Sequence, residues 1–317
     1  MNKPNKPGLP APGNPSLRIR QKYHGGMVEH TGVGTAVYDA FLTVFMLLVI
    51  LACVAPIWHV LMASFSNGKE MNGFSGLVFW PRGTGGAFNL QGHSLLFTAD
   101  RLWTSYGNTL LYVVTATAIG FVINVCGGYV ISRNTMLSRP MSVFVMFSMM
   151  FTGGLVPTYM VVKTLGMVGT HWSLIIPGCT NGIFLLLMTG AFRAVPESTV
   201  EAARIDGAGH LRTLFHIMLP QDMSLGTVVV LNSVIMQWNS WYSASIYVQA
   251  NRDAWPLQLW LKDFLAQNTS FTYSNVDYNR YLLKYGAICI ATVPMLMAFP
   301  FFLKYIEKGV ILGGIKE

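Results

Sequence analysis

The polar side chains that could bind a partner or a ligand form two groups in this chain of 317 residues. The first group lies at 193–220, where acidic and basic side chains are mixed with helix-breaking Gly and Pro. The second lies at 232–242, where amide and hydroxyl side chains stand beside Trp and Tyr. The first composition suits a charged protein contact. The second suits hydrogen bonding combined with aromatic stacking.

Long apolar segments surround both groups. Hydrophobic residues make up 52% of the chain and charged residues only 11%, against about 25% charged residues in soluble domains. A helix needs about 20 residues to cross the hydrocarbon of a bilayer. Six segments reach that length with few charges, and their unbroken apolar character predicts an all-α membrane protein rather than a β-barrel: 37–63, 107–131, 141–162, 172–192, 223–248 and 281–305.

The basic residues predict how these helices are oriented. An even number of spans places both termini on one side, and most of the 21 Lys and Arg residues then fall on that side. Because basic residues concentrate in cytosolic loops, we expect cytosolic N- and C-termini. Residues 1–34 are rich in Pro, Gly, Asn and Lys and are expected to be a disordered cytosolic tail, so residues 35–317 would form the transmembrane domain.

The segment 193–220 reads as a helix, a turn and a second helix at the inner surface. Glu197 and Glu201 lie near the positive start of the first helix, and Gly207 permits a sharp break. In the second helix, one face is expected to carry Leu211, Leu214, Phe215 and Met218. Acidic and basic residues are balanced, which favours a protein groove over a lipid surface.

This segment resembles the "EAA" loop of bacterial ABC importer permeases. The matching residues are Glu201-Ala202-Ala203, Asp206-Gly207-Ala208, Phe215 and Leu219-Pro220. The segments 151–166, 238–242 and 304–314 are similar to the MalG-like carbohydrate permeases, in the branch for complex oligosaccharides. The resemblance runs from about Tyr38 to the C-terminus. It implies a multi-pass protein of the bacterial cytoplasmic membrane with six transmembrane helices and a cytosolic helix-turn-helix coupling loop.

The same resemblance implies roles and partners. Glu201 would make a charged contact to an ATPase subunit, Ala202 and Ala203 would allow close approach, Gly207 would provide the turn, and Phe215 would be an apolar anchor; Asp206 belongs to the same coupling surface. The partners would be a second homologous permease, two nucleotide-binding ATPase subunits and an extracytoplasmic solute-binding protein. ATP and Mg would be used by the ATPase, and the chain itself would bind no cofactor.

The second polar group is a candidate for the solute pathway. Gln237, Asn239 and Trp241 are the leading candidates, because amides bind ligand hydroxyls while aromatic rings cover the apolar faces of sugar rings. Further candidates are Asn232, Trp238 and Tyr242, and weaker ones are Asn108, Thr109, Thr180 and Asn181. For each of them, interhelical hydrogen bonding or packing stays an open alternative. Gly153, Gly154 and Pro157 would either loosen the third span or let helices pack closely.

Catalysis by the chain itself is not expected. The only Gly-Lys pair, Gly68-Lys69, has Ala63 where a phosphate-binding loop needs its first Gly. Neither an H-E-x-x-H nor a G-x-S-x-G pattern occurs. The four cysteines all fall within predicted spans, where a thiol behaves as a small apolar group, so no metal site is predicted: Cys53, Cys126, Cys179 and Cys289.

Other functions stay open at this stage. The imported solute could be a polyol, a glycerol phosphate or a peptide instead of an oligosaccharide. A channel or ion-coupled carrier would need ionisable residues inside its spans, whereas Asp39 and Asp222 lie near span ends. A non-transport membrane scaffold is a third class. Among sugars, fragments of acidic polysaccharides such as alginate or pectin follow from the branch resemblance, and Arg252 and Lys262 are compatible with an anionic ligand.

Overall fold

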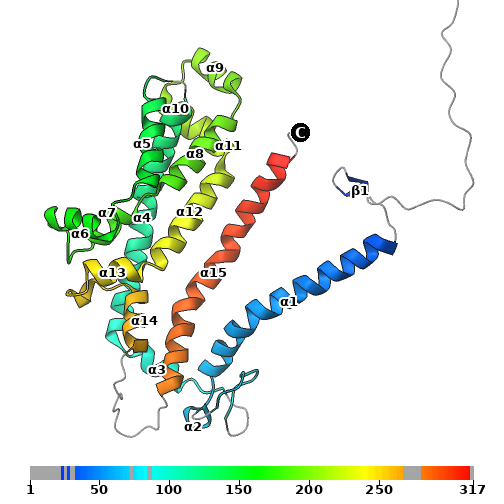
Figure 1. Ribbon diagram of the computed structural model, residues 1–317, viewed down its shortest axis with the longest axis vertical. Helices are drawn as coiled ribbons and strands as arrows, with labels where there is room; N and C mark the ends of the chain where they lie inside the picture. Colours follow the sequence, from blue (N-terminus) through cyan, green and yellow to red (C-terminus); the bar gives the residue numbers. More distant parts are fainter. Residues whose placement is uncertain are drawn as a thin grey trace, which may run out of the picture. The chain divides into compact units, whose positions relative to one another are not determined.

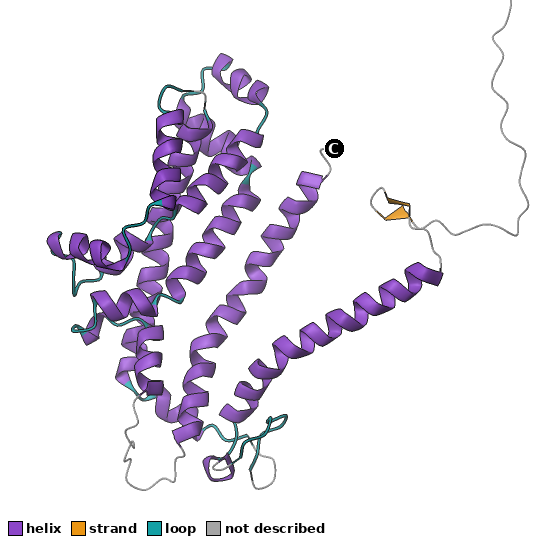
Figure 2. Ribbon diagram, viewed as in Figure 1, coloured by secondary structure: helices purple, strands orange, loops and turns teal. Residues whose placement is uncertain are grey.

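A computed structural model describes residues 23–24, 27–28, 33–71, 74–83, 88–133, 135–266 and 280–314. These residues are almost entirely helical (Figure 2). The chain divides into two compact units, residues 1–58 and 59–317. The expectation of an all-α membrane protein is confirmed.

The first unit contains a short strand pair and most of one long helix. Strands β1 (Tyr23–His24) and β2 (Met27–Val28) pair antiparallel. Helix α1 (Val33–Ser64) begins in this unit, and its last residues belong to the second unit. The predicted tail 1–34 lies mostly outside the described residues, and the strand pair within it was not predicted from the sequence.

The second unit contains all the remaining helices (Figure 1). Their bounds are α2 Gly68–Met71, α3 Gln91–Phe97, α4 Asp100–Ser132, α5 Ser138–Met150, α6 Leu155–Thr164, α7 Trp172–Gly178, α8 Gly182–Ala194, α9 Glu197–Ile205, α10 His210–Thr213, the π-helix η2 Leu214–Met218, α11 Leu219–Gln221, α12 Met223–Trp238, α13 Trp241–Tyr247, the 3₁₀ helix η3 Arg252–Ala254, α14 Leu257–Ala266 and α15 Arg280–Gly314.

Three of the predicted spans are continuous helices and three are bent. Within α1, α4 and α15 lie stretches long and apolar enough to cross a bilayer without a break. Three helix pairs reach that length only together: α5 with α6, bent by 115°; α7 with α8, bent by 42°; and the segment 210–221 with α12, bent by 86°. Six spans are therefore present if each bent pair counts as one span.

The third and fifth spans differ most from the sequence expectation. The third was expected to be one helix over 141–162, but α5 ends at Met150 and α6 starts after Gly154, whose φ of 82° is a left-handed conformation favoured by glycine. The fifth was expected to run to 248, but α12 ends at Trp238. There the side chains of Asn239 and Ser240 donate hydrogen bonds to carbonyls of the last helical turn, which competes with continuing the helix.

Helix α4 is the packing axis of the second unit. At Gly120 an added Cβ would overlap the backbone carbonyl of Cys179, and at Gly128 it would lie 2.8 Å from the Cβ of Met188. These two glycines let α4 approach α7 and α8 more closely than larger residues would permit. On its other sides α4 packs against α12 and α14.

The second unit has two clearly separate ends (Figure 1). Helices α9 and α10 lie at one end, called here the α9 end, together with the C-terminal end of α15. Helices α2 and α3 lie at the other, called here the α3 end. Segments that the sequence assigned to opposite sides of the membrane are thus at opposite ends of this unit.

His93, in α3, is a buried titratable group at the α3 end. Its side chain is 8% exposed and its ring stacks on Phe65 at 5.0 Å. Burial lowers the pKa of this imidazole below its usual value, because the charged form loses hydration. The neutral form of His93 is therefore the one that fits the folded chain.

Candidate coupling segment and polar membrane pocket

Helices α9 to α11 form the segment that the sequence predicted as helix, turn and helix. Helix α9 ends in two hydrogen bonds of a glycine C-cap, from the Gly207 N–H to the Arg204 carbonyl and from the Ala208 N–H to the Ala203 carbonyl. Gly207 has φ of 80°, so it forms the turn. The chain then continues through α10, the π-helix η2 and α11 into α12.

The inward side of this segment is anchored on the membrane helices. Val200, Leu214 and Met218 are buried in one cluster with Phe192 of α8 and Val125 of α4. The anchoring also has polar contacts. The Tyr129 hydroxyl of α4 lies 3.0 Å from Nδ1 of His210, and the Arg133 guanidinium donates to the Phe192 carbonyl at 3.2 Å. A displacement of α9 and α10 would therefore reach α4 and α8 directly.

The outward side carries most of the predicted coupling residues. Glu201, Ala202, Asp206 and Gly207 are exposed, and Phe215 is 42% exposed. Ala203 is 6% exposed, so it packs against the chain itself and does not lie on the open surface.

The expected single apolar face of the second helix is split in two. Leu214 and Met218 are buried in the core, whereas Leu211 and Phe215 are 70% and 42% exposed. The π-helix η2 changes the angular spacing of residues 214–218, so the α-helical stripe drawn from the sequence was wrong here.

A polar pocket of about 370 Å³ lies between α6, α7, α12 and α13 and is called here the α12–α13 pocket. It is lined by two of the three leading pathway candidates, Gln237 and Asn239, and by one of the three further candidates, Tyr242. Asp, Glu, Lys, Arg and His are all absent from its lining within the described part of the chain. The pocket therefore offers hydrogen bonds and aromatic surface without a full charge.

Gln237 holds the wall of this pocket together. Its Nε2 donates a 2.6 Å hydrogen bond to the Gly178 carbonyl, and the residue is 5% exposed. Gly178 is the last residue of α7, next to the bend between α7 and α8, where a carbonyl lacks an intrahelical partner. Gln237 thus ties α12 to that bend.

The other three of these six candidates lie outside the pocket. Trp238 is 6% exposed and packs in a cluster with Leu102 and Trp260, as the packing alternative expects. Asn232 is exposed and donates to the Val228 carbonyl of its own helix at 2.9 Å. Trp241 is 40% exposed, with the Lys262 ammonium 4.5 Å from its ring centre.

The weaker candidates bridge between segments. The Asn108 amide donates to the carbonyls of Asp253 at 2.6 Å and Trp255 at 3.1 Å, and Thr109 accepts from the Leu257 N–H at 2.8 Å. The Thr180 hydroxyl donates to Asn124 of α4 at 3.0 Å. The neighbouring Asn181 caps the start of α8 by accepting from the Ile183 N–H. These contacts are structural in the described chain.

Sequence reasoning missed part of the lining. Ser240, Ser243 and Tyr247 line the pocket and recur at i, i+3 and i+7, which is a helical stripe that the sequence contains. Thr158 and Ser173 come from α6 and α7, and no local pattern links them to α12. In the described ranges, no cluster of three or more His, Cys, Asp or Glu side chains is placed to hold a metal ion.

The chain is similar to known proteins along most of its length. No protein-family model matches it. The chain is 29% identical over 286 residues to the polygalacturonan/rhamnogalacturonan transport system permease protein YtcP of Bacillus subtilis, covering 88% of this chain and 98% of that one. It is 25% identical over 270 residues to the arabinooligosaccharides transport system permease protein AraQ of Halalkalibacterium halodurans, covering 83% and 91%.

Among solved structures, the chain matches a bacterial ABC transporter involved in the import of the acidic polysaccharide alginate. The TM-score is 0.80 at 22% identity, with 88% of this chain and 99% of that chain covered. The chain is similar to ABC importer permeases along most of its length. Its resemblance to the carbohydrate-uptake type is confirmed, because relatives of which it covers 80% or more are named as permeases of sugar transport systems.

Proposed function

We propose that this permease forms one half of the translocation pathway of an ATP-driven importer for oligosaccharides, with fragments of acidic polysaccharides as the leading class of solute. The exposed set at the α9 end carries the proposal. Glu201, Asp206 and Phe215 are turned outward, while Val200, Leu214 and Met218 fasten the same segment to the membrane helices. A surface built this way can bind another protein and transmit that protein's conformational change to the membrane helices.

The motor in this proposal is a separate ATPase. Glu201 makes a charged contact to it, Ala202 allows close approach, and Phe215 fills an apolar site on it. ATP and Mg are bound and used by that partner. The complete importer contains a second homologous permease, two ATPase subunits and an extracytoplasmic solute-binding protein, with the α9 end and both termini of this chain in the cytosol.

The α12–α13 pocket supplies a surface for the solute. Its Gln, Asn, Ser and Thr groups can exchange hydrogen bonds with sugar hydroxyls, and Tyr242 and Tyr247 offer aromatic faces to a pyranose ring. The described lining carries no full charge, so these contacts recognise the hydroxyls and ring faces of the solute and not a carboxylate. The acidic class is supported by two matched systems, named for polygalacturonan and for alginate.

A reconstitution experiment tests the proposal. The permease, co-purified with its second permease and ATPase, is placed in liposomes together with the solute-binding protein. We expect ATP-dependent accumulation of oligogalacturonates or of a neutral oligosaccharide, and ATPase activity that rises with the loaded binding protein. Transport by this chain without a nucleotide-hydrolysing partner would contradict the proposal. Labelling of a Glu201→Cys variant from the extracytoplasmic side would contradict it as well.

A further inference from the structure

A second cavity, of about 550 Å³, lies at the α3 end and is called here the arginine pocket. It is lined by residues of α3, α4, η3, α14 and α15 together with Trp255. Its volume falls within the range of about 300–1,000 Å³ typical of small-molecule sites. None of the residues assigned above to coupling or to the α12–α13 pocket lines it.

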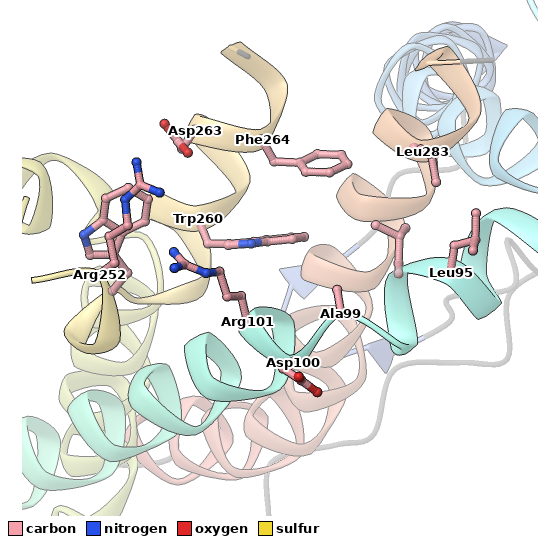
Figure 3. A pocket seen from close by; sticks show the side chains of 11 residues that line it. Leu95, Ala99, Asp100, Arg101, Arg252, Trp260, Asp263, Phe264 and Leu283 are labelled. Atoms are coloured by element: carbon pink, nitrogen blue, oxygen red, sulfur yellow. The ribbon is translucent and has the colours of Figure 1, made fainter. Parts of the chain in front are cut away.

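Three of the four charged side chains that line this cavity lie near one another (Figure 3). Figure 3 shows the side chains of Arg101, Arg252 and Asp263 near one end of Trp260, whereas Leu95 and Leu283 lie toward the other end. Within the part of the chain that the structure describes, neither guanidinium has a hydrogen bond or an ion pair with a side chain. Arg252 lies over the Trp255 ring at 5.5 Å. Two guanidinium groups are thus available to a ligand.

The aromatic wall beside these arginines is held in place. Trp260 is 9% exposed and stacks on Phe264 with ring centres 5.1 Å apart. The start of α14 is fixed to α4, because the Leu257 N–H donates to Thr109 and the Tyr112 hydroxyl donates to the Ala254 carbonyl at 2.7 Å. The pocket wall is therefore preformed, which lowers the entropy cost of binding.

The mixture of groups selects among ligands. A bare anion would pair with Arg101 and Arg252 but would gain nothing from Asp263 and Asp100, which also line the cavity. A neutral sugar would donate hydrogen bonds to the carboxylates but would offer the two guanidinium groups no bidentate carboxylate partner. A saccharide that carries a carboxylate uses both sets, since its hydroxyls donate to the aspartates and its carboxylate accepts from arginine in a bidentate pair.

We propose that the arginine pocket is a binding site for a uronate unit of an acidic oligosaccharide, separate from the α12–α13 pocket. The carboxylate lies against Arg101 and Arg252, and the sugar ring lies on the Trp260 and Phe264 wall. The site holds the solute at the α3 end before it reaches the middle of the membrane. The choice of an acidic sugar rests on the proposed function, whereas the cavity and its charges do not.

A binding measurement tests this site. The purified permease complex in nanodiscs, without nucleotide, is titrated calorimetrically with digalacturonate and with its neutral counterpart, a digalactoside. We expect digalacturonate to bind at least about tenfold more tightly, since a charge-assisted bidentate pair accounts for such a factor. We expect the affinity to fall as salt is raised, because the pocket is partly open to solvent.

Variants locate the binding. The double change Arg101→Gln with Arg252→Gln should weaken digalacturonate binding at least about tenfold and remove the preference over the digalactoside. Lys163→Gln, which removes an exposed positive charge on α6, serves as the matched control and should leave the affinity unchanged. A melting temperature for each variant reports on folding.

The outcomes separate this inference from the proposed function. Equal affinity of the wild-type chain for the two disaccharides, or equal affinity of the double variant and the wild type, overturns the arginine-pocket site. If the double variant does not fold, salt-independent binding by the wild-type chain overturns it instead. Uptake of neutral oligosaccharides without any digalacturonate binding leaves the importer function standing and refutes the site. Digalacturonate binding without oligosaccharide transport leaves the site standing and refutes the importer function.

Discussion

The coupling segment and the α12–α13 pocket are built in opposite ways. The coupling segment is continuous in sequence, from α9 to α11, and its functional candidates are exposed while its anchors are buried. The pocket is assembled from α6, α7, α12 and α13, and one of its main polar groups, Gln237, is buried and bonded within the chain. Exposed residues of the coupling segment can therefore be replaced without loss of the fold. Replacing the buried Gln237 of the pocket also removes a contact between helices.

This difference separates the effects expected of mutations. Changes on the outward side of the coupling segment should affect transport and leave stability intact. Changes where helices meet should lower stability first, and transport only as a result. Four variants test this separation, beginning with the largest expected effect.

Glu201→Lys should abolish uptake while the permease stays folded in the membrane. Glu201 is exposed on α9, so the new lysine is solvated in the isolated chain and the fold is kept. In the importer, the lysine repels the positive group of the ATPase that would pair with Glu201. Uptake in cells, together with the amount of permease in the membrane, measures both effects. Glu70→Lys, the same change on exposed α2 at the other end, is the control and should transport normally. Normal uptake by Glu201→Lys would remove the coupling contact.

Gly120→Val should lower stability strongly. The added side chain collides with the backbone of Cys179, which cannot move as a side chain can, so the cost should exceed the about 1–3 kcal/mol usual for overpacking. Gly107→Val in the same helix meets nothing within 4 Å and controls for the change in helix propensity. Unfolding of the two variants in detergent checks the difference. Equal stability would mean that α4 and α7 are not closely packed.

Gln237→Leu should have an intermediate effect. It removes the hydrogen bond to the Gly178 carbonyl, at a cost of about 0.6 kcal/mol, the average for hydrogen bonds between helices inside membranes. Asn232→Leu breaks only a bond within its own helix at an exposed position, so its stability should change less. Denaturant unfolding measured on both variants tests this order, and a larger loss for Asn232→Leu would contradict it.

His93 should give the smallest effect, visible as a dependence of stability on pH. Because burial lowers its pKa below 6.5, the unfolded chain binds more protons than the folded chain just below that pH. Its contribution to the unfolding free energy is complete above about pH 6.5 and is lost as the pH falls toward the lowered value. Thermal unfolding between those limits measures the slope. His93→Gln should flatten it, and an unchanged slope would exclude His93 as its source.

The sequence predicted what depends on local pattern. Apolar length located the three continuous spans and the three bent helix pairs, and the Gly and Pro signals located the helix, turn and helix at 193–220. It did not predict the π-helix at 214–218 or the end of α12 at Trp238. Both depend on how backbone hydrogen bonds compete with side-chain bonds and packing, which apolar periodicity does not report.

The pocket shows the same limit. Composition alone identified Gln237, Asn239 and Tyr242 as candidates for the solute pathway. It could not show that they line the pocket while Trp238 packs in the core. Facing direction depends on the neighbours that α12 meets in three dimensions. The contributions of Thr158 and Ser173 depend on helices distant in sequence, which a single sequence cannot pair.

The break at Gly154 has a consequence for the energy barrier that a polar solute faces. Helix α5 has 13 residues, so at 1.5 Å per residue it is about 20 Å long, shorter than a hydrocarbon layer of about 30 Å. Open backbone at residues 151–154 is tolerated at that depth only beside protein or water. Water at this position would shorten the low-dielectric part of the path. The distance that the solute crosses away from water would then be less than the thickness of the bilayer.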